Sequence, residues 1–361
     1  MKNRSIWLRC ETKKNERRTP LIPAHAQLIC NTGIKLFVER SDERIYSNEE
    51  YETAGCELVE PGSWVNADKN CYVIGLKELP SLNHPISQQH IYFAHAFKKQ
   101  AGSDLLLSQF KQGGGTILDY EFLLDCFNQR VVTGSFSYWA GFCGAAISLF
   151  IWDDKQKKQP YSIPLFYQNE NNLITELEKR ITTWSSLPKI LIIGANGFSG
   201  KGARALFNRL NITPDLWFRH HTKNKGPFSE ALEYDMLVNC INLTTKIKPF
   251  ITKELLDNNK QLSIITDVSC DVTSRYNPLP IYHSVTTFME PAYRVESRSQ
   301  MPIDLIGIDH LASFLPKESS DAFSSQLLPF LLQLVACGPH LEKSVWKNAI
   351  KKYEDAIQKL G

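Results

Sequence analysis

The sequence lacks a secretory signal, a long apolar segment and an excess of charge, and each absence narrows the class of protein. The N-terminal stretch MKNRSIWLRCETKKNERR has no apolar core of the kind that a signal peptide requires. No apolar run suggests a membrane-spanning helix. The 41 basic and 38 acidic residues give a net charge of +3, which favours neither nucleic acid nor a membrane surface. We therefore expect a cytoplasmic protein, monomeric or a small homo-oligomer, that acts on a small molecule.

The nine cysteines are scattered and include no C-x-x-C pair. An odd number of isolated thiols is typical of a reduced, cytosolic protein, and no familiar metal-ligand spacing occurs. We expect neither structural disulfides nor a metal site.

The length of 361 residues predicts two domains, and 43% hydrophobic with 22% charged residues is typical of a globular chain. Short apolar runs alternate with helical patterns, which favours parallel sheets. In the first third we expect strands at 6–10, 35–39, 71–76, 91–94 and 116–120, and helices at 48–54 and 101–111. Further on we expect helices at 137–149 and 172–185, a polar loop at 153–159, and strands at 190–194, 216–219, 235–241, 262–268 and 303–308. The tail from residue 321 is expected to be helical and to pack back on the first domain.

One segment, KILIIGANGFSGKGARALF at 189–207, has the order strand, glycine turn, helix. A dinucleotide-binding βαβ unit needs this order, because a pyrophosphate must approach bare backbone at the N-terminus of a helix. The pattern predicts the following cofactor-binding residues: Gly194, Gly197, Phe198, Ser199 and Gly200.

Charged residues follow several expected strands of the first domain, and in open parallel sheets ligands bind at these carboxyl ends. They are Arg9–Lys13, Lys77 with Glu78, His95 with Lys98, and Asp119–Glu121. His95 suits proton transfer near neutral pH, whereas Lys77 can act as a base only if its pKa falls from about 10.4. Arg18 could grip a carboxylate with both arms of its guanidinium. Each alone could be a solvated strand end, but together they predict a pocket.

Strand ends of the second domain also carry charge. Asp309 and His310 could face the nicotinamide end of a cofactor or form an ordinary strand-end pair, and of Asp267 and Asp271 one is expected to be structural.

These residues, in this order, resemble saccharopine dehydrogenase of the lysine-forming type, and more distantly alanine dehydrogenase and the transhydrogenase superfamily. The similarity runs from about Leu8 to Trp346 through LRCETKKNERR, VIGLKELP, IYFAHAFKKQAG, TILDYEFL, YWAGFCGAA, ILIIGANGFSG and IDHLASFLP. The resemblance implies two Rossmann-like α/β domains with parallel sheets separated by a cleft. It places the substrate domain at 1–135 plus 318–361 and the dinucleotide domain at 136–317.

The resemblance also implies a reaction, in which saccharopine, water and an oxidised nicotinamide cofactor give L-lysine, 2-oxoglutarate and reduced cofactor. It implies that Lys77 is the base for the amine and that His95 is the acid–base group for water addition. The implied substrate carboxylate ligands are Arg18, Lys98 and Arg130, and the implied acidic groups around the bases are Glu16, Glu78 and Glu121. Asp309 and His310 match residues near the nicotinamide.

Two departures from the family pattern leave alternatives open. Where the family has an acid after the second strand of the dinucleotide domain, this chain has Arg219 in a basic cluster, which favours NADP over NAD or is a solvated loop. A paired arginine of the family is Gln129-Arg130 here, so a related imino acid with a different amine half would fit the same core. The remaining alternatives are a dehydrogenase for a primary amine and an inactive dinucleotide-binding homologue.

Overall fold

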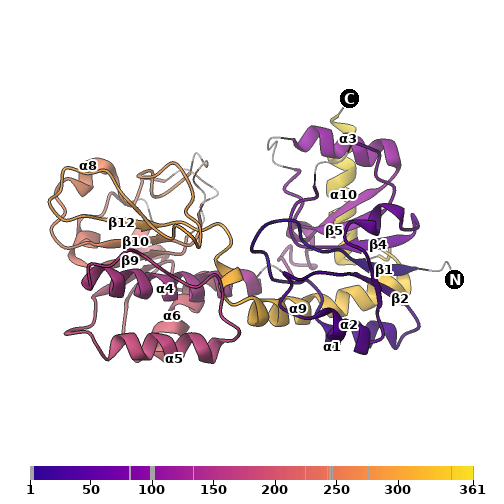
Figure 1. Cartoon of the computed structure of the whole chain (residues 1–361). Helices are drawn as coiled ribbons and strands as arrows, with labels where there is room; N and C mark the ends of the chain where they lie inside the picture. The colour runs from indigo at the N-terminus through magenta and orange to yellow at the C-terminus, as the bar shows by residue number, and fades with distance from the viewer. Residues whose placement is uncertain are drawn as a thin grey trace. The chain divides into compact units, whose positions relative to one another are not determined.

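The computed structural model describes residues 4–80, 83–97, 102–132, 134–223, 225–241, 243, 245, 247–270, 272, 274, 276–342 and 344–360. The chain folds into two compact units. The first unit comprises residues 1–135 and 316–361, and the second comprises residues 136–315. Both chain termini therefore belong to the first unit, and each unit is built on its own sheet (Figure 1).

The first unit contains a six-stranded sheet of order β3-β2-β1-β4-β5-β6, in which every neighbouring pair is parallel. Its strands are β1 (Ser5–Leu8), β2 (Lys35–Glu39), β3 (Glu57–Val59), β4 (Cys71–Ile74), β5 (Gln89–Tyr92) and β6 (Thr116–Asp119). Because all the strands run the same way, the segments that follow them emerge at one edge of the sheet. The short edge strand β3 was not expected from the sequence.

The helices of the first unit come from both ends of the chain. They are α1 (Pro23–Cys30), α2 (Asn48–Thr53), α3 (Ser103–Gly113), α9 (Pro316–Cys337) and α10 (Val345–Gln358). In α10 the buried residues Trp346, Ala349 and Tyr353 recur at helical spacing, and the Tyr353 hydroxyl donates to the Gly115 carbonyl at 2.9 Å. In α9 the Ser320 hydroxyl accepts the Thr19 N–H at 3.0 Å. The tail thus completes the first unit.

The second unit contains a six-stranded sheet of order β11-β12-β10-β9-β7-β8. Its strands are β7 (Ile190–Ile193), β8 (Asp215–Trp217), β9 (Met236–Asn239), β10 (Ile264–Asp267), β11 (Tyr293–Arg294) and β12 (Asp304–Ile306). All pairs are parallel except β11 with β12. The antiparallel edge strand β11 is two residues long and was also not expected.

Both faces of this second sheet are covered. Its helices are α4 (Gly134–Gln156), α5 (Glu170–Ile181), α6 (Phe198–Arg209), α7 (Arg219–Thr222) and α8 (Lys253–Leu256), with α4 beginning at the unit boundary. Ile190 and Ile192 of β7 pack into one core with α4, α5 and α6, whereas Leu191 and Ile193 pack into a second core on the opposite face. This alternation is what a doubly covered parallel strand requires.

The polar loop expected at 153–159 was wrong at its start, because α4 continues to Gln156. Asp153 accepts hydrogen bonds from Arg180 at 3.0 Å and from the Trp184 indole at 2.8 Å. Its side chain is only 2% exposed. Partners on and just after α5 therefore compensate the buried carboxylate, and the helix extends past the polar residues.

Helix α4 bears on the expectation that no apolar run reaches membrane-spanning length. By length and composition alone Gly134–Gln156 could cross a membrane, but 67% of its most apolar 18-residue stretch is buried inside the protein. Gly141 and Gly202 let α4 and α6 pack closely, since a Cβ at Gly202 would lie 1.9 Å from the Tyr138 carbonyl oxygen. We interpret α4 as a core helix.

Candidate active site and dinucleotide site

The three glycines of the turn between β7 and α6 meet three different requirements. Gly194 has a φ of +86°, which an L side chain rarely adopts. A Cβ at Gly200 would lie 2.3 Å from the Gly194 carbonyl oxygen, so Gly200 permits close packing of helix on strand. A Cβ at Gly197 would meet nothing closer than that same oxygen at 3.5 Å. The space beside Gly197 is therefore open to a ligand at the N-terminus of α6.

A cavity of about 600 Å³ opens beside this turn within the second unit. Its described lining includes Gly194, Gly197, Arg219 and Lys223 but no carboxylate. The strand expected to reach Arg219 ends at Trp217, because the Phe218 N–H turns to donate to the His221 ring at 2.9 Å. Arg219 then begins α7 and is exposed at the cavity.

The other residues predicted to contact the cofactor lie at element ends of the same unit. Phe198 and Ser199 form the first turn of α6, with Phe198 61% exposed. Asp309 and His310 follow β12, where they share a hydrogen bond and the His310 ring lies edge-on to Phe288. Asp267 is structural, because its buried carboxylate accepts hydrogen bonds from Asn239 and Tyr282, and Asp271 lies outside the described residues.

In the first unit, Glu16 and Arg18 form a buried ion pair in the loop after β1. Arg18 Nε and Nη2 donate to the two Glu16 carboxylate oxygens at 2.7 and 2.5 Å. Burial acts to raise the pKa of Glu16, but the positive charges of Arg18 and Lys77 outweigh it and lower the pKa to about 2. One edge of the Arg18 guanidinium thus already binds a carboxylate of the protein, so its role as a substrate ligand stays a prediction.

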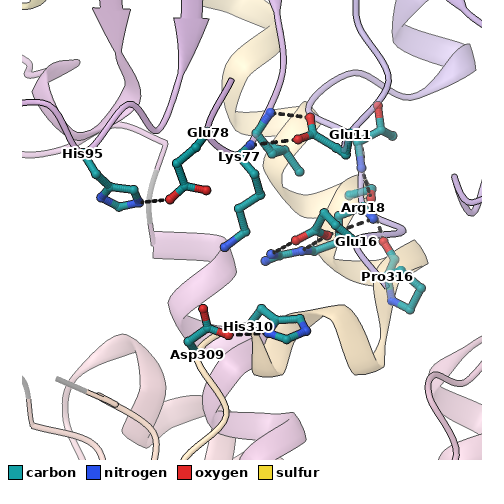
Figure 2. A network of polar contacts seen from close by, with 12 residues as sticks. Glu11, Glu16, Arg18, Lys77, Glu78, His95, Asp309, His310 and Pro316 are labelled. Carbon is teal, nitrogen blue, oxygen red and sulfur yellow. Dashed lines mark hydrogen bonds and ion pairs between the residues drawn. The ribbon is translucent and has the colours of Figure 1, made fainter. Parts of the chain in front are cut away.

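Lys77 lies three residues beyond β4, half-buried, and its side chain extends toward the Glu16–Arg18 pair (Figure 2). Glu78 is exposed beside it and lies 3.8 Å from the His95 Nε2. His95 has a φ of +51°, a conformation uncommon outside glycine that is often found at functional sites. The structure therefore gathers Lys77, Glu78, His95, Glu16 and Arg18 at one edge of the sheet.

The remaining residues predicted at this edge of the sheet lie in different surroundings. Glu121 is half-buried on the turn after β6, where its N–H donates to Asp119 at 2.8 Å. Arg130 is exposed and forms an isolated antiparallel bridge with Leu124. Lys98 lies outside the described residues.

Arg9 and Glu11 lie within the charged strand end Arg9–Lys13 predicted from the sequence, which assigned neither of them a role of its own. Glu11 accepts the backbone N–H groups of Leu76 and Lys77, and Arg9 donates to the Lys77 carbonyl. The glycine in VIGLKE was the sequence feature that could have indicated their contact with Lys77, because Gly75 leaves the space that the Arg9 side chain occupies. Among the described residues, no group of three or more His, Cys, Asp or Glu side chains could hold a metal ion.

Comparison with known proteins reveals relatives along the whole chain. Residues 7–143 match the family described as alanine dehydrogenase/PNT, N-terminal domain. The chain is 40% identical to a saccharopine dehydrogenase [NAD(+), L-lysine-forming] of Schizosaccharomyces pombe, covering 98% of this chain and 99% of the relative. It is also 40% identical to the enzyme of the same name from Yarrowia lipolytica, covering 99% and 98%.

The fold is shared more widely than the sequence. A solved structure of L-alanine dehydrogenase superposes with a TM-score of 0.72 at 16% identity, covering 99% of this chain and all of that one. This similarity confirms the expected fold of two Rossmann-like units.

Proposed function

The chain belongs to the family of lysine-forming saccharopine dehydrogenases, and on that premise we propose that it cleaves saccharopine oxidatively to L-lysine and 2-oxoglutarate. The observation that carries the proposal is the placement of Lys77 between a buried Glu16–Arg18 pair and a Glu78–His95 pair. A base for an amine and an acid–base group for water are the two protein groups that this reaction needs.

We assign cofactor binding to the second unit, 136–315, and substrate binding to the first unit, 1–135 with 316–361. The open space at Gly197 and the adjacent cavity fit a nicotinamide dinucleotide, whose pyrophosphate would lie at the N-terminus of α6. When bound, the cofactor supplies the acceptor for the hydride that leaves the glutaryl α-carbon. Asp309 and His310 are assigned to the nicotinamide end.

The side chains of the first unit carry the proton transfers. Lys77 takes the proton of the secondary amine, which prepares the carbon–nitrogen bond for oxidation to an imine. His95 then removes a proton from the attacking water and returns one to the departing lysine amine as the carbinolamine collapses. Glu78, at 3.8 Å from His95, holds the imidazole within reach of this role.

The charged residues around these bases bind and balance the substrate, which carries three carboxylates. We assign carboxylate binding to Arg18, Lys98 and Arg130, and tuning of the two bases to Glu16, Glu78 and Glu121. The negative charge of Glu16 favours the protonated form of Lys77, and we assign to the positive charge of Arg18, paired with Glu16, the role of offsetting it so that the lysine can act as a base.

Two observations on the choice of cofactor point in opposite directions. The relatives carry NAD(+) in their names, which does not support the NADP preference drawn from the sequence. Arg219 and Lys223 line the cavity where a ribose-binding acid would otherwise lie. On the second ground we propose that the cavity admits a 2′-phosphate, so that NADP is used as well as NAD.

The variant Arg219→Asp tests the cofactor proposal. We expect NADPH to bind about tenfold more weakly, because a charge-assisted hydrogen bond is lost, while NADH binding is retained. Lys225→Asp, at an exposed residue outside the cavity lining, is the matched control. Equal NADPH affinity in the parent and the Arg219 variant would contradict the proposal.

The reaction itself is tested by absorbance at 340 nm with lysine, 2-oxoglutarate and NADH or NADPH. Oxidation that requires both substrates supports the proposal. Lys77→Met should reduce kcat by about 10² to 10⁴ while cofactor affinity persists, whereas Lys69→Met, at an exposed lysine of the same unit, should not. Full activity of the Lys77 variant would exclude it as the base.

Alternative substrates are separated by the same assay. A related imino acid with another amine half is favoured by Gln129, which stands where the family has a second arginine. In that case oxidation would need 2-oxoglutarate and a different amine. A primary-amine dehydrogenase would turn over with ammonia instead, and an inactive homologue would bind cofactor without turnover on any amino acid tested.

The state of the cysteines bears on the compartment in which the protein works. None of the nine cysteines, all within the described residues, forms a disulfide, and burial raises the pKa of Cys71 to about 11 and that of Cys56 to about 12. A chain with this many thiols outside disulfides suits a reducing compartment. We propose a cytoplasmic enzyme with small-molecule partners and no nucleic-acid or membrane partner.

A further inference from the structure

The main chain around Lys77 is held by two charged residues of a neighbouring segment. Strands β1 and β4 pair in parallel with Leu8 opposite Ile74, and the Arg9 N–H donates to the Ile74 carbonyl at 3.0 Å. The segments that follow the two strands therefore run side by side. This register brings Arg9 and Glu11 against Lys77.

Glu11 binds the two peptide N–H groups that lead into Lys77. One carboxylate oxygen accepts the Leu76 N–H at 2.6 Å, and the other accepts the Lys77 N–H at 2.9 Å. The Glu11 side chain is 6% exposed, so water competes little for these bonds. A single carboxylate thus fixes two successive peptide groups (Figure 2).

Arg9 binds the other side of the same residue. Its Nη2 donates to the Lys77 carbonyl, and its Nη1 lies 3.4 Å from the Glu11 carboxylate. The Arg9 side chain is 1% exposed. The peptide groups before and after Lys77 are therefore both held by charged partners.

Gly75 makes room for this arrangement. A Cβ at Gly75 would lie 2.3 Å from Arg9 Nε and 2.4 Å from Arg9 Cζ. Gly75 does not have a positive φ, so backbone conformation does not require a glycine there. The glycine is required because any larger side chain at position 75 would overlap the side chain of Arg9.

A simpler interpretation is that Glu11 only neutralises the buried charge of Arg9. The distances argue against it, because Glu11 lies 3.4 Å from Arg9 but 2.6 and 2.9 Å from the Leu76 and Lys77 nitrogens. The shorter bonds are those to the main chain that carries the lysine.

We propose that Arg9 and Glu11 are positioning residues that clamp the Lys77 main chain and so set where its amine meets the substrate. The proposal rests on the proposed function, in which Lys77 is the base. A base displaced by about 1 Å can lose about 10² in rate even when binding is unchanged.

The first test compares Glu11→Gln with Glu39→Gln. Glu39 is buried in the same unit and also accepts backbone N–H groups, those of Cys10 and Trp64 at 3.0 Å, but none from Lys77. Both variants should lower Tm. Only Glu11→Gln should lower kcat, by about tenfold or more, with KM and cofactor affinity within about twofold. An equal fall of kcat in Glu11→Gln and Glu39→Gln would contradict the proposal that Glu11 positions Lys77.

A second test asks whether Glu11 acts through Lys77. Ethylamine added to Lys77→Ala supplies a base without a main-chain tether. If Glu11 acts through Lys77, the rescued rate should be the same in Lys77→Ala and in the double variant Lys77→Ala/Glu11→Gln. A rescued rate tenfold lower in the double variant would assign Glu11 a general structural role and overturn the proposal.

Gly75→Ala covers the case in which the Glu11 variant does not fold. The added methyl should displace the Arg9 guanidinium and lower kcat while Glu11 remains, and unchanged kcat in this variant would count against the clamp. Lys77→Met is run beside these variants to separate two failures. If it retains activity, the assignment of the base fails and the clamp with it; if it is inactive while Glu11→Gln is not, the clamp alone fails.

Discussion

Replacing His90 should make the first unit less sensitive to acid. His90 lies on β5, 0% exposed, with Trp64 and Phe110 edge-on at 4.7 and 5.3 Å. Neither ring nitrogen has a hydrogen-bond partner among the described residues. Burial, with a smaller contribution from the Arg9 charge, holds the pKa of His90 well below 6.5.

The magnitude follows from the difference in proton binding between the two states. In the unfolded chain His90 takes up a proton as pH falls through about 6.5, but in the folded protein its lowered pKa postpones that uptake to a lower pH. The stability is therefore fully present above that pH and is lost below it, at about 1.4 kcal/mol per pH unit. At pH 5 the loss due to this one residue has an upper limit of about 2 kcal/mol, which applies if folded His90 takes up no proton.

The variant His90→Phe keeps a planar ring among the same aromatic neighbours and removes the titration. Between pH 7 and pH 5 its free energy of unfolding should fall less than that of the parent, by up to about 2 kcal/mol. Urea unfolding measures this difference, and hydrogen exchange of the β5 amides reports on the first unit alone. His84→Phe, at an exposed histidine, is the matched control. If the parent and the His90 variant lose equal stability, the reasoning is refuted.

Two further predictions concern the dinucleotide turn and the buried ion pair. Gly200→Ala should destabilise the second unit by about 1–3 kcal/mol because its Cβ would overlap the Gly194 carbonyl, whereas Gly197→Ala should leave Tm nearly unchanged and weaken NADH binding. Thermal unfolding with a fluorescence titration distinguishes these outcomes, and equal Tm losses would contradict the division of roles. Glu16→Gln should cost about 3–5 kcal/mol at pH 7, because it leaves Arg18 buried without its counter-charge. Since the pKa of Glu16 is lowered from 4.5 to about 2, its contribution to the free energy of unfolding is present above pH 4.5 and is lost as pH falls toward 2. Urea unfolding should therefore show that the difference in free energy of unfolding between parent and variant becomes smaller from pH 4.5 to pH 2. A difference in free energy of unfolding that stays constant with pH would count against a stabilising Glu16–Arg18 ion pair.

Much of the fold could be predicted from the sequence because the relevant signals are local. Short apolar runs alternating with helical patterns indicated parallel sheets, and the requirement for glycine at Gly194 and Gly200 is met within a single turn. The predicted strand at 35–39 was confirmed to the residue. Such features depend on residues close along the chain, so a single sequence carries them.

The sequence by itself also placed Lys77, Glu78 and His95 at strand ends, because polar residues that stop apolar runs mark the carboxyl edge of a parallel sheet. Only the tertiary structure decided which charged groups meet. It paired Arg18 with Glu16, extended α4 through Asp153 toward Arg180, and brought Glu11 to the main chain of Lys77 across 66 positions of sequence. The partner of a charged side chain depends on which loops the strand register sets side by side, and that register is a property of the assembled sheet.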